Sequence, residues 1–240
     1  MRIRIIKVIV SNVMNEITWK ETLQIKAPDT EIEIVNIDKG PDNIECFYEE
    51  VLASAYIVDK AVQAQKDGCD GVFISCFADP AVDASREQVK IPVVGGFQPA
   101  ALAASLISDK WSVVTVSKNV VPMIRGVARK LGIENNIASI RDINTPFLEL
   151  LDENIVKERL LIQIQKAVDE DGAEAIVLGC TGLGRVAQHL AQQMAAKGKP
   201  VPVVSPTAAA IGFLELLIRS KVSQSRLTYR GAPDIKRRCE

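Results

Sequence analysis

Apolar runs and amphipathic stretches alternate along almost the whole chain. Several apolar runs are continuous and rich in Val and Ile, which is typical of strands that are covered on both faces. These runs predict strands at Ile3–Val10, Glu31–Ile37, Gly71–Ser75, Pro92–Gly95, Ser112–Val116, Ile137–Ile143, Ala175–Leu178 and Pro202–Ser205. The stretches between them predict helices at Glu45–Gln65, Pro80–Val89, Pro99–Ile107, Pro122–Leu131, Phe147–Asp169, Leu183–Lys197 and Thr207–Lys221. Such alternation indicates an α/β fold with mostly parallel sheets flanked by helices.

An internal repeat divides the chain into two similar parts. The segment from Asp67 to Cys76 reads DGCDGVFISC, and the segment from Asp171 to Cys180 reads DGAEAIVLGC. Both begin with Asp-Gly, continue as an apolar run and end on cysteine, and the cysteines stand 104 positions apart (180 − 76). A repeat with so long a period predicts two copies of one α/β unit.

Two such units predict two pseudo-symmetric lobes. We expect residues 1–96 plus 206–240 to form the first lobe and residues 97–205 the second, with the last helix returning to pack on the first lobe. Open α/β sheets bind ligands at the carboxyl ends of their strands. The two repeated cysteines should therefore face each other across one cleft between the lobes.

Cys76 and Cys180 each follow a buried strand and precede a predicted helix. A thiol in this position lies near backbone N–H groups that favour the thiolate. Racemisation at a carbon acid needs a base on one face and an acid on the other, and turnover exchanges their protonation states. A matched pair of thiols meets this need. One cysteine at a strand end would more often be core packing, but two at equivalent repeat positions favour a site.

The other cysteines and the single histidine suggest no further chemistry. Cys46, Cys69 and Cys239 have no repeat partners, so we interpret them as structural. With His189 the only histidine, a zinc site or a Cys-His pair is hard to assemble, and we expect no metal. Unpaired cysteines at wide spacings favour reduced thiols and a cytoplasmic protein.

Charge and hydropathy exclude two classes of partner. The 29 basic and 30 acidic side chains give a net charge of −1, so no concentrated basic surface for nucleic acid is expected. The locally basic stretch 226–238 is interpreted as a solvated terminus. The apolar start of the chain is interrupted by Arg4 and Lys7 and is followed by no signal-peptide cleavage site, and no run is long enough for a membrane span.

The two cysteine segments resemble the motifs of a known family. ISCFADPA (74–81) and VLGCTGLG (177–184) are similar to the paired motifs of the aspartate/glutamate/hydantoin racemase superfamily, above all to its hydantoin racemase branch, which includes allantoin racemases. The segments Ser85–Gly95, Val121–Ile124 and Val203–Ala208 support the resemblance. It implies two α/β lobes, neither pyridoxal phosphate nor any other cofactor, proton abstraction by one cysteine and proton delivery by the other.

The resemblance has departures that bear on the substrate. Amino-acid racemases of this superfamily usually have Asn-Thr after the first cysteine and Thr-His after the second, whereas this chain has Phe77 and Thr181-Gly182. The polar groups that would hold an α-amino acid are missing, and a phenyl ring beside Cys76 suits a flat heterocycle. Of the Asn-Pro-Asn-Thr loop common in the hydantoin branch, only Asn12 is kept.

Candidate substrate-binding residues lie beside the strand ends: Asn12, Phe77, Ser117, Thr181 and Gly182. Asn12 could donate to a substrate carbonyl, although a plain turn residue is an equal alternative, and Ser117 is its counterpart in the second lobe. The N–H and hydroxyl of Thr181 could stabilise an enolate.

We therefore expect a cofactor-independent racemase of a 5-substituted hydantoin or an allantoin-like ring that forms a homo-oligomer. An aspartate/glutamate-type racemase, an enzyme like arylmalonate decarboxylase or maleate isomerase, and a non-catalytic small-molecule binding protein remain alternatives.

Overall fold

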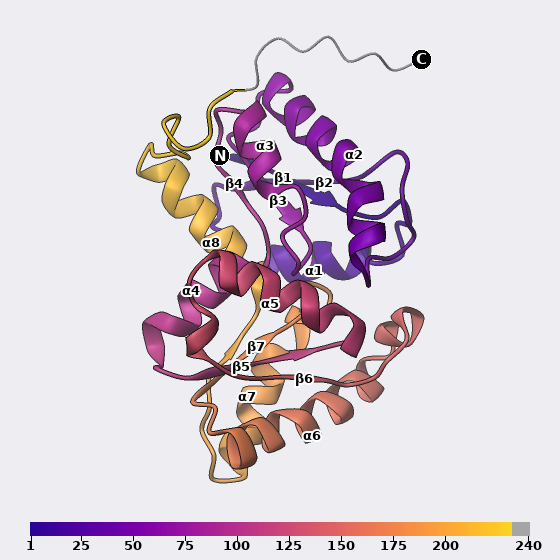
Figure 1. Ribbon diagram of the computed structural model, residues 1–240, viewed down its shortest axis with the longest axis vertical. Helices are drawn as coiled ribbons and strands as arrows, with labels where there is room; N and C mark the ends of the chain where they lie inside the picture. The colour runs from indigo at the N-terminus through magenta and orange to yellow at the C-terminus, as the bar shows by residue number, and fades with distance from the viewer. Residues whose placement is uncertain (232–240) are drawn as a thin grey trace.

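The computed structural model describes residues 1–231, in which two parallel sheets are stacked as two lobes (Figure 1). The first sheet has the order β2-β1-β3-β4, and its strands are β1 (Arg2–Lys7), β2 (Glu31–Asn36), β3 (Gly71–Ser75) and β4 (Val93–Val94). The second has the order β6-β5-β7-β8, with β5 (Trp111–Thr115), β6 (Ile137–Asp142), β7 (Ala175–Leu178) and β8 (Val203–Val204). The identical order in both sheets confirms the predicted α/β class and matches the repeat.

Helices alternate with strands in the same order in both halves of the chain. They are α1 (Asn15–Ile25), α2 (Phe47–Lys66), α3 (Val82–Gln88), α4 (Phe97–Ile107), α5 (Val121–Lys130), α6 (Glu153–Asp171), α7 (Ala187–Ala196) and α8 (Pro206–Arg219). Short 3-10 turns form η1 (Lys118–Val120), η2 (Glu134–Asn136), η3 (Phe147–Leu151) and η4 (Gly184–Val186). The hydrophobic pattern did not predict α1, whose inward side is partly polar: Thr18, Glu21 and Thr22 are its buried residues.

Each sheet is covered on one face by helices of its own half. On the first sheet, Ile57 of α2 and Val82 of α3 join a core cluster with Ile6 and Val72. On the second, α6 and α7 make the corresponding cluster on β7, with Leu160 and Leu190 among its residues. Burial of these continuous apolar faces is the main favourable contribution to folding.

The opposite faces are covered by an exchange of helices between the halves. Ala210, Ile211 and Leu214 of α8 pack on the first sheet, although α8 follows the last strand of the second. Conversely, the alanines of α4 pack on β5 and β7 together with Trp111. In Figure 1, α4 and α5 lie between the two sheets. The division into lobes 1–96 plus 206–240 and 97–205 stays a prediction. It assigns α8 to the first lobe and α4 to the second, which is where each helix packs.

The last helix therefore has a counterpart in the repeat. It follows β8 as α4 follows β4, and it packs on the first sheet, as expected. Within residues 1–231 no helix is long and apolar enough to cross a membrane. Of the basic stretch 226–238, Lys236, Arg237 and Arg238 lie outside the described residues, as does Cys239.

Candidate active site

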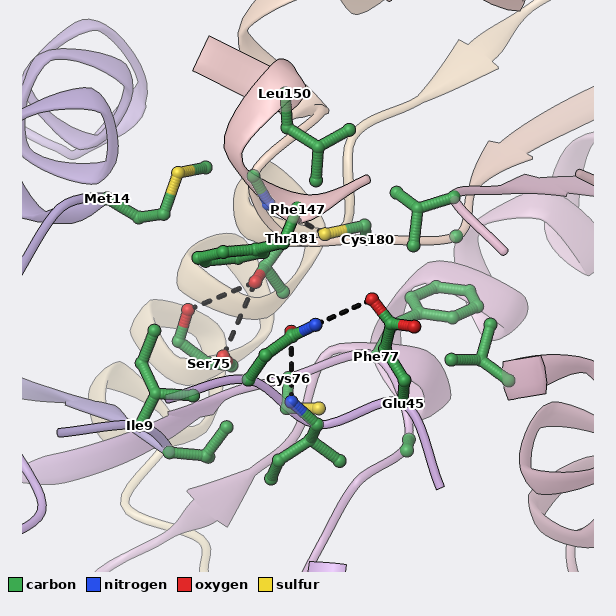
Figure 2. Close-up of a pocket in the computed structure, with 18 of the residues that line it drawn as sticks. Ile9, Met14, Glu45, Ser75, Cys76, Phe77, Phe147, Leu150, Cys180 and Thr181 are labelled. Carbon is green, nitrogen blue, oxygen red and sulfur yellow. Dashed lines mark hydrogen bonds between the residues drawn. The ribbon is translucent and has the colours of Figure 1, made fainter. Parts of the chain in front are cut away.

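A cavity opens where the carboxyl ends of both sheets meet. Its lining contains the residues that follow β1, β3, β5 and β7, including both repeated cysteines. Figure 2 shows Cys76 and Cys180 on opposite sides of this pocket, one from each lobe. The fold thus brings together the pair that the repeat predicts, at the kind of strand-end cleft where α/β proteins bind ligands.

Both cysteines occupy the same kind of turn. The thiol of Cys180 accepts a hydrogen bond from the backbone N–H of Gly182 at 3.4 Å. The thiol of Cys76 is held in the same way by the N–H of Ala78, again two residues further along the chain. Each side chain is partly buried and neither forms a disulfide. The pair is therefore presented as two free, half-buried thiols with matched backbone donors.

Burial has the largest effect on the pKa of both thiols. It raises the pKa of Cys76 to about 12, with the carboxylates of Asp79 and Glu50 adding to the rise. It also raises the pKa of Cys180, but there the cations of Lys7 and Arg185 oppose the rise. A thiolate is stabilised by positive neighbours and destabilised by removal from water. The two thiols are thus alike in geometry and unlike in electrostatic surroundings.

A chain of hydrogen bonds crosses the floor of the cavity from one lobe to the other. The Lys7 Nζ donates to the Ser75 hydroxyl at 3.2 Å, and the Ser75 hydroxyl donates to the Thr181 hydroxyl at 3.2 Å. Thr181 is itself buried, and its backbone carbonyl accepts from the Thr207 hydroxyl at 3.2 Å. This network fixes the residue before Cys76 against the residue after Cys180.

Gly182 lies in close contact with the end of a neighbouring side chain. A Cβ atom added at this position would lie 2.5 Å from the terminal methyl carbon of Met14 and 3.7 Å from the Cys180 Sγ. Met14 is buried and lines the cavity. The space that a histidine would occupy after Thr181 is therefore already filled by an apolar side chain.

Most of the remaining wall is apolar and comes from both lobes. Phe77 lines the cavity, but its ring is only 4% exposed and packs edge-on against Phe97, with 5.2 Å between the ring centroids. Phe147 and Leu150 of η3 form the wall beside Cys180 (Figure 2). At the rim, the loop before α2 is braced by a 2.6 Å hydrogen bond from the Asn43 amide to the Glu45 carboxylate.

Of the predicted substrate-binding residues, Phe77, Thr181 and Gly182 line the cavity, whereas Asn12 and Ser117 do not. Asn12 is exposed and its carbonyl accepts from the N–H of Asn15 at 2.9 Å. The Ser117 hydroxyl accepts from the N–H of Asn119 at 3.2 Å and so caps η1. The contact of Asn12 and Ser117 with substrate stays a prediction, and their absence from the cavity lining does not support it.

Several residues of the cavity wall were not among the predicted site residues. Lys7, Met14, Ser75 and Phe147 all line the cavity and were not predicted. The available signal was Lys7, a charged residue in the middle of an apolar run, because a lysine is almost never fully buried without partners.

Comparison with known proteins shows the family of the chain. The family model for Asp/Glu/hydantoin racemase matches residues 13–214. A hydantoin racemase of Rhizobium meliloti is 33% identical over 218 residues, 90% of this chain and 88% of that protein. Another, of Paenarthrobacter aurescens, is 32% identical over 220 residues and covers 91% of each chain. The solved structure of the allantoin racemase from Klebsiella pneumoniae superposes with a TM-score of 0.92 at 28% identity, covering 98% of this chain and 95% of that one.

The fold and the paired strand-end site are those of a two-lobed α/β isomerase. The chain belongs to the Asp/Glu/hydantoin racemase family. It is a racemase of a small substrate.

Proposed function

We propose that the protein racemises a 5-substituted hydantoin or an allantoin-like ring by proton transfer between Cys76 and Cys180, without a cofactor. The observation that carries the proposal is the placement of two free thiols on opposite sides of one cavity, each in the same turn of its own lobe. Its relatives named as hydantoin and allantoin racemases support the choice of substrate.

The chemistry follows from this arrangement. A thiolate on one side takes the proton from the ring's stereogenic carbon, and the electron pair moves onto the adjacent carbonyl oxygen to give an enolate. The thiol on the other side then returns a proton to the opposite face, so the thiolate ends on the second cysteine. Thr181 lies beside Cys180 and supplies polar groups close to the developing oxyanion.

The wall favours a neutral ring over an acidic amino acid. Ile9, Met14, Phe147 and Leu150 present apolar groups, which suit a flat, uncharged heterocycle. Met14 also fills the position that a histidine after Thr181 would need. An aspartate or glutamate substrate would bring a second carboxylate into this apolar space, at a large cost in desolvation.

The test is a panel of enantiopure substrates in deuterated solvent. Allantoin, several 5-substituted hydantoins, aspartate, glutamate and an arylmalonate are each incubated with the protein. We expect loss of optical rotation and exchange of the α-hydrogen with ring substrates only, starting from either enantiomer. Racemisation confined to aspartate or glutamate, release of carbon dioxide from the malonate, or binding without exchange would each contradict the proposal and point to one named alternative.

A further inference from the structure

Lys7, the last residue of β1, is a buried cation at the floor of the cavity. It is 4% exposed, and its Nζ donates to the Thr18 hydroxyl at 3.1 Å and to the Ser75 hydroxyl at 3.2 Å. Both partners are neutral, so neither offsets the charge. Burying an ammonium is costly, and burial lowers the pKa of Lys7. The groups that oppose this lowering and favour the charged form of Lys7 are Cys180, Cys76 and Glu21.

The second lobe has no cation at the matching position. Ile3 pairs with Gly71 in the first sheet as Trp111 pairs with Ala175 in the second, so Thr115 corresponds to Lys7 and Gly179 to Ser75. Thr115 uses its hydroxyl to donate to the Gly179 carbonyl at 2.9 Å. The pseudo-two-fold relation between the lobes is therefore broken beside the cysteines by one positive charge.

The charged groups around the two thiols differ in sign. Lys7 on β1 and Arg185 on η4 act on Cys180 as cations, and Glu21 on α1 acts on it as an anion. Lys7 also acts on Cys76, but less than on Cys180. The carboxylates of Asp79 and Glu50 act on Cys76 as anions, and a thiolate at Cys180 adds to the rise in the pKa of Cys76. Positive surroundings favour a thiolate at Cys180, and negative surroundings favour a neutral thiol at Cys76.

We propose that Lys7 is a positioning residue that makes Cys180 the resting base and leaves Cys76 the resting acid. The inference rests on the proposed two-thiol racemisation and adds a direction to it. A substrate that turns its α-hydrogen toward Cys180 can react at once. The other enantiomer must wait until the proton has moved from Cys76 to Cys180.

Glu21 provides the opposing charge and so a second way to test the assignment. It is buried, and its Oε1 accepts from the Ser205 hydroxyl at 2.7 Å. A Cβ at Gly184 would lie 2.0 Å from the same oxygen, which shows how tightly the carboxylate is enclosed. If fixed charges determine the reactivity of Cys180, removing Lys7 and removing Glu21 must change it in opposite directions.

The experiment measures thiol alkylation by iodoacetamide as a function of pH, resolved by peptide mass spectrometry. Cys46 is exposed and serves as the internal reference. In the unmodified protein Cys180 should react faster than Cys76 at neutral pH. Lys7→Met should slow Cys180 about tenfold, because removing the cation lowers the fraction of thiolate at that cysteine. Glu21→Gln should speed Cys180 several-fold, and neither change should alter Cys46.

Arg4→Met is the matched control, because it also removes a buried cation from β1. Arg4 pairs with Glu33 at 2.8 Å and Asp67 at 2.7 Å, away from the cavity lining. It should leave the alkylation of Cys180 unchanged. If Lys7→Met does not give folded protein by near-ultraviolet circular dichroism, Lys7→Gln replaces it with the same expected result.

An unchanged Cys180 rate in the Lys7 variant overturns the inference, as does a change of the same sign in the Lys7 and Glu21 variants. Alkylation needs no substrate, so its outcome is separate from that of the substrate panel. A racemase with unaltered thiol reactivity in the Lys7 variant would refute the role of Lys7 alone. Altered reactivity without racemisation of any substrate would refute the proposed function alone.

Discussion

The two lobes of this protein share their strand order but differ in what lies behind each cysteine. In the first lobe, β3 ends at Ser75. The Ser75 hydroxyl accepts a hydrogen bond from the Lys7 Nζ and donates one to the Thr181 hydroxyl of the other lobe. In the second lobe, Gly179 follows the strand, and its carbonyl accepts a hydrogen bond from the Thr115 hydroxyl. The backbone of the site is thus duplicated while its polar floor is built by one lobe alone.

The difference shows that a duplicated fold can supply symmetric geometry without symmetric chemistry. Two-sided proton transfer needs thiols that are alike in position. It also needs one of them charged and the other neutral before the reaction begins, and a symmetric environment would favour neither. The following predictions test this comparison, from the largest expected effect to the smallest.

Loss of either thiol should remove racemisation. We expect Cys76→Ser and Cys180→Ser each to lower kcat/KM more than about 10³-fold, because a hydroxyl is a far weaker acid and cannot replace a thiolate as base. Polarimetry with an enantiopure hydantoin measures this. Buried Cys69, which does not line the cavity, gives the matched control Cys69→Ser. Racemisation at the unmodified rate in either Cys76→Ser or Cys180→Ser would exclude the two-thiol mechanism.

The charge of Glu21 should be visible in the pH dependence of stability. Burial raises the pKa of Glu21 from 4.5 to about 7. The folded state then binds more protons than the unfolded state between these values, so the free energy of unfolding falls as pH rises through this window. Above pH 7 the loss from this group amounts to at most about 3 kcal/mol. Glu21→Gln should remove it, as urea denaturation at several pH values would measure.

Asp79, whose pKa burial raises to about 6, contributes a decline of the same sign that Glu21→Gln leaves in place. The comparison of the two proteins therefore isolates Glu21. An identical pH dependence with glutamate and with glutamine at this position would contradict its assignment as a buried, titrating group.

Ser75→Ala should weaken the connection between the lobes. The substitution removes an acceptor for Lys7 and a donor to Thr181. Lys7 keeps its bond to Thr18 and Thr181 its bond to the Ser75 carbonyl, so each buried group loses one partner. We expect a loss of about 2 kcal/mol in the free energy of unfolding. The serine at the edge of η1, Ser117, provides the control Ser117→Ala, which should cost less because that hydroxyl makes only a local cap. Equal losses in both variants would argue against the bridge.

Gly182→Ala should reduce activity about threefold, because the new methyl group must push the flexible end of Met14 aside in the cavity wall. Ala78 stands two residues after Cys76, as Gly182 stands two residues after Cys180, and it already carries a Cβ. Ala78→Gly is therefore the matched change in the first lobe and should have a smaller effect on kcat/KM. Met14→Ala in the Gly182→Ala background should restore activity; if it does not, the close contact is not the cause.

Much of the fold could be predicted from the sequence because the signals are local. Continuous Val- and Ile-rich runs such as 71–75 define strands, and the predicted and observed bounds of β3 and β7 coincide. Helix α1 was missed because its buried side includes Thr18 and Glu21, so hydrophobic periodicity was weak. The reason for those polar residues lies in the site and not in the core.

The site was predictable only as far as the repeat reaches. Cys76 and Cys180 stand out because the same position recurs, and Thr181 and Gly182 follow directly from it. Asn12 and Ser117 were chosen by proximity in sequence, but neither lines the cavity. Lys7 and Met14 belong to the first lobe alone, so comparison of the two repeats could not identify them.

The exchange of α4 and α8 has a consequence for the autonomy of each half. A fragment ending at Ile107 would carry the first sheet without α8, and it would carry α4 without the sheet on which that helix packs. Such a fragment cannot bury its own apolar faces. Two copies of the fragment could cover each other's apolar faces only by exchanging helices. Half of this chain is therefore not expected to fold as an independent domain.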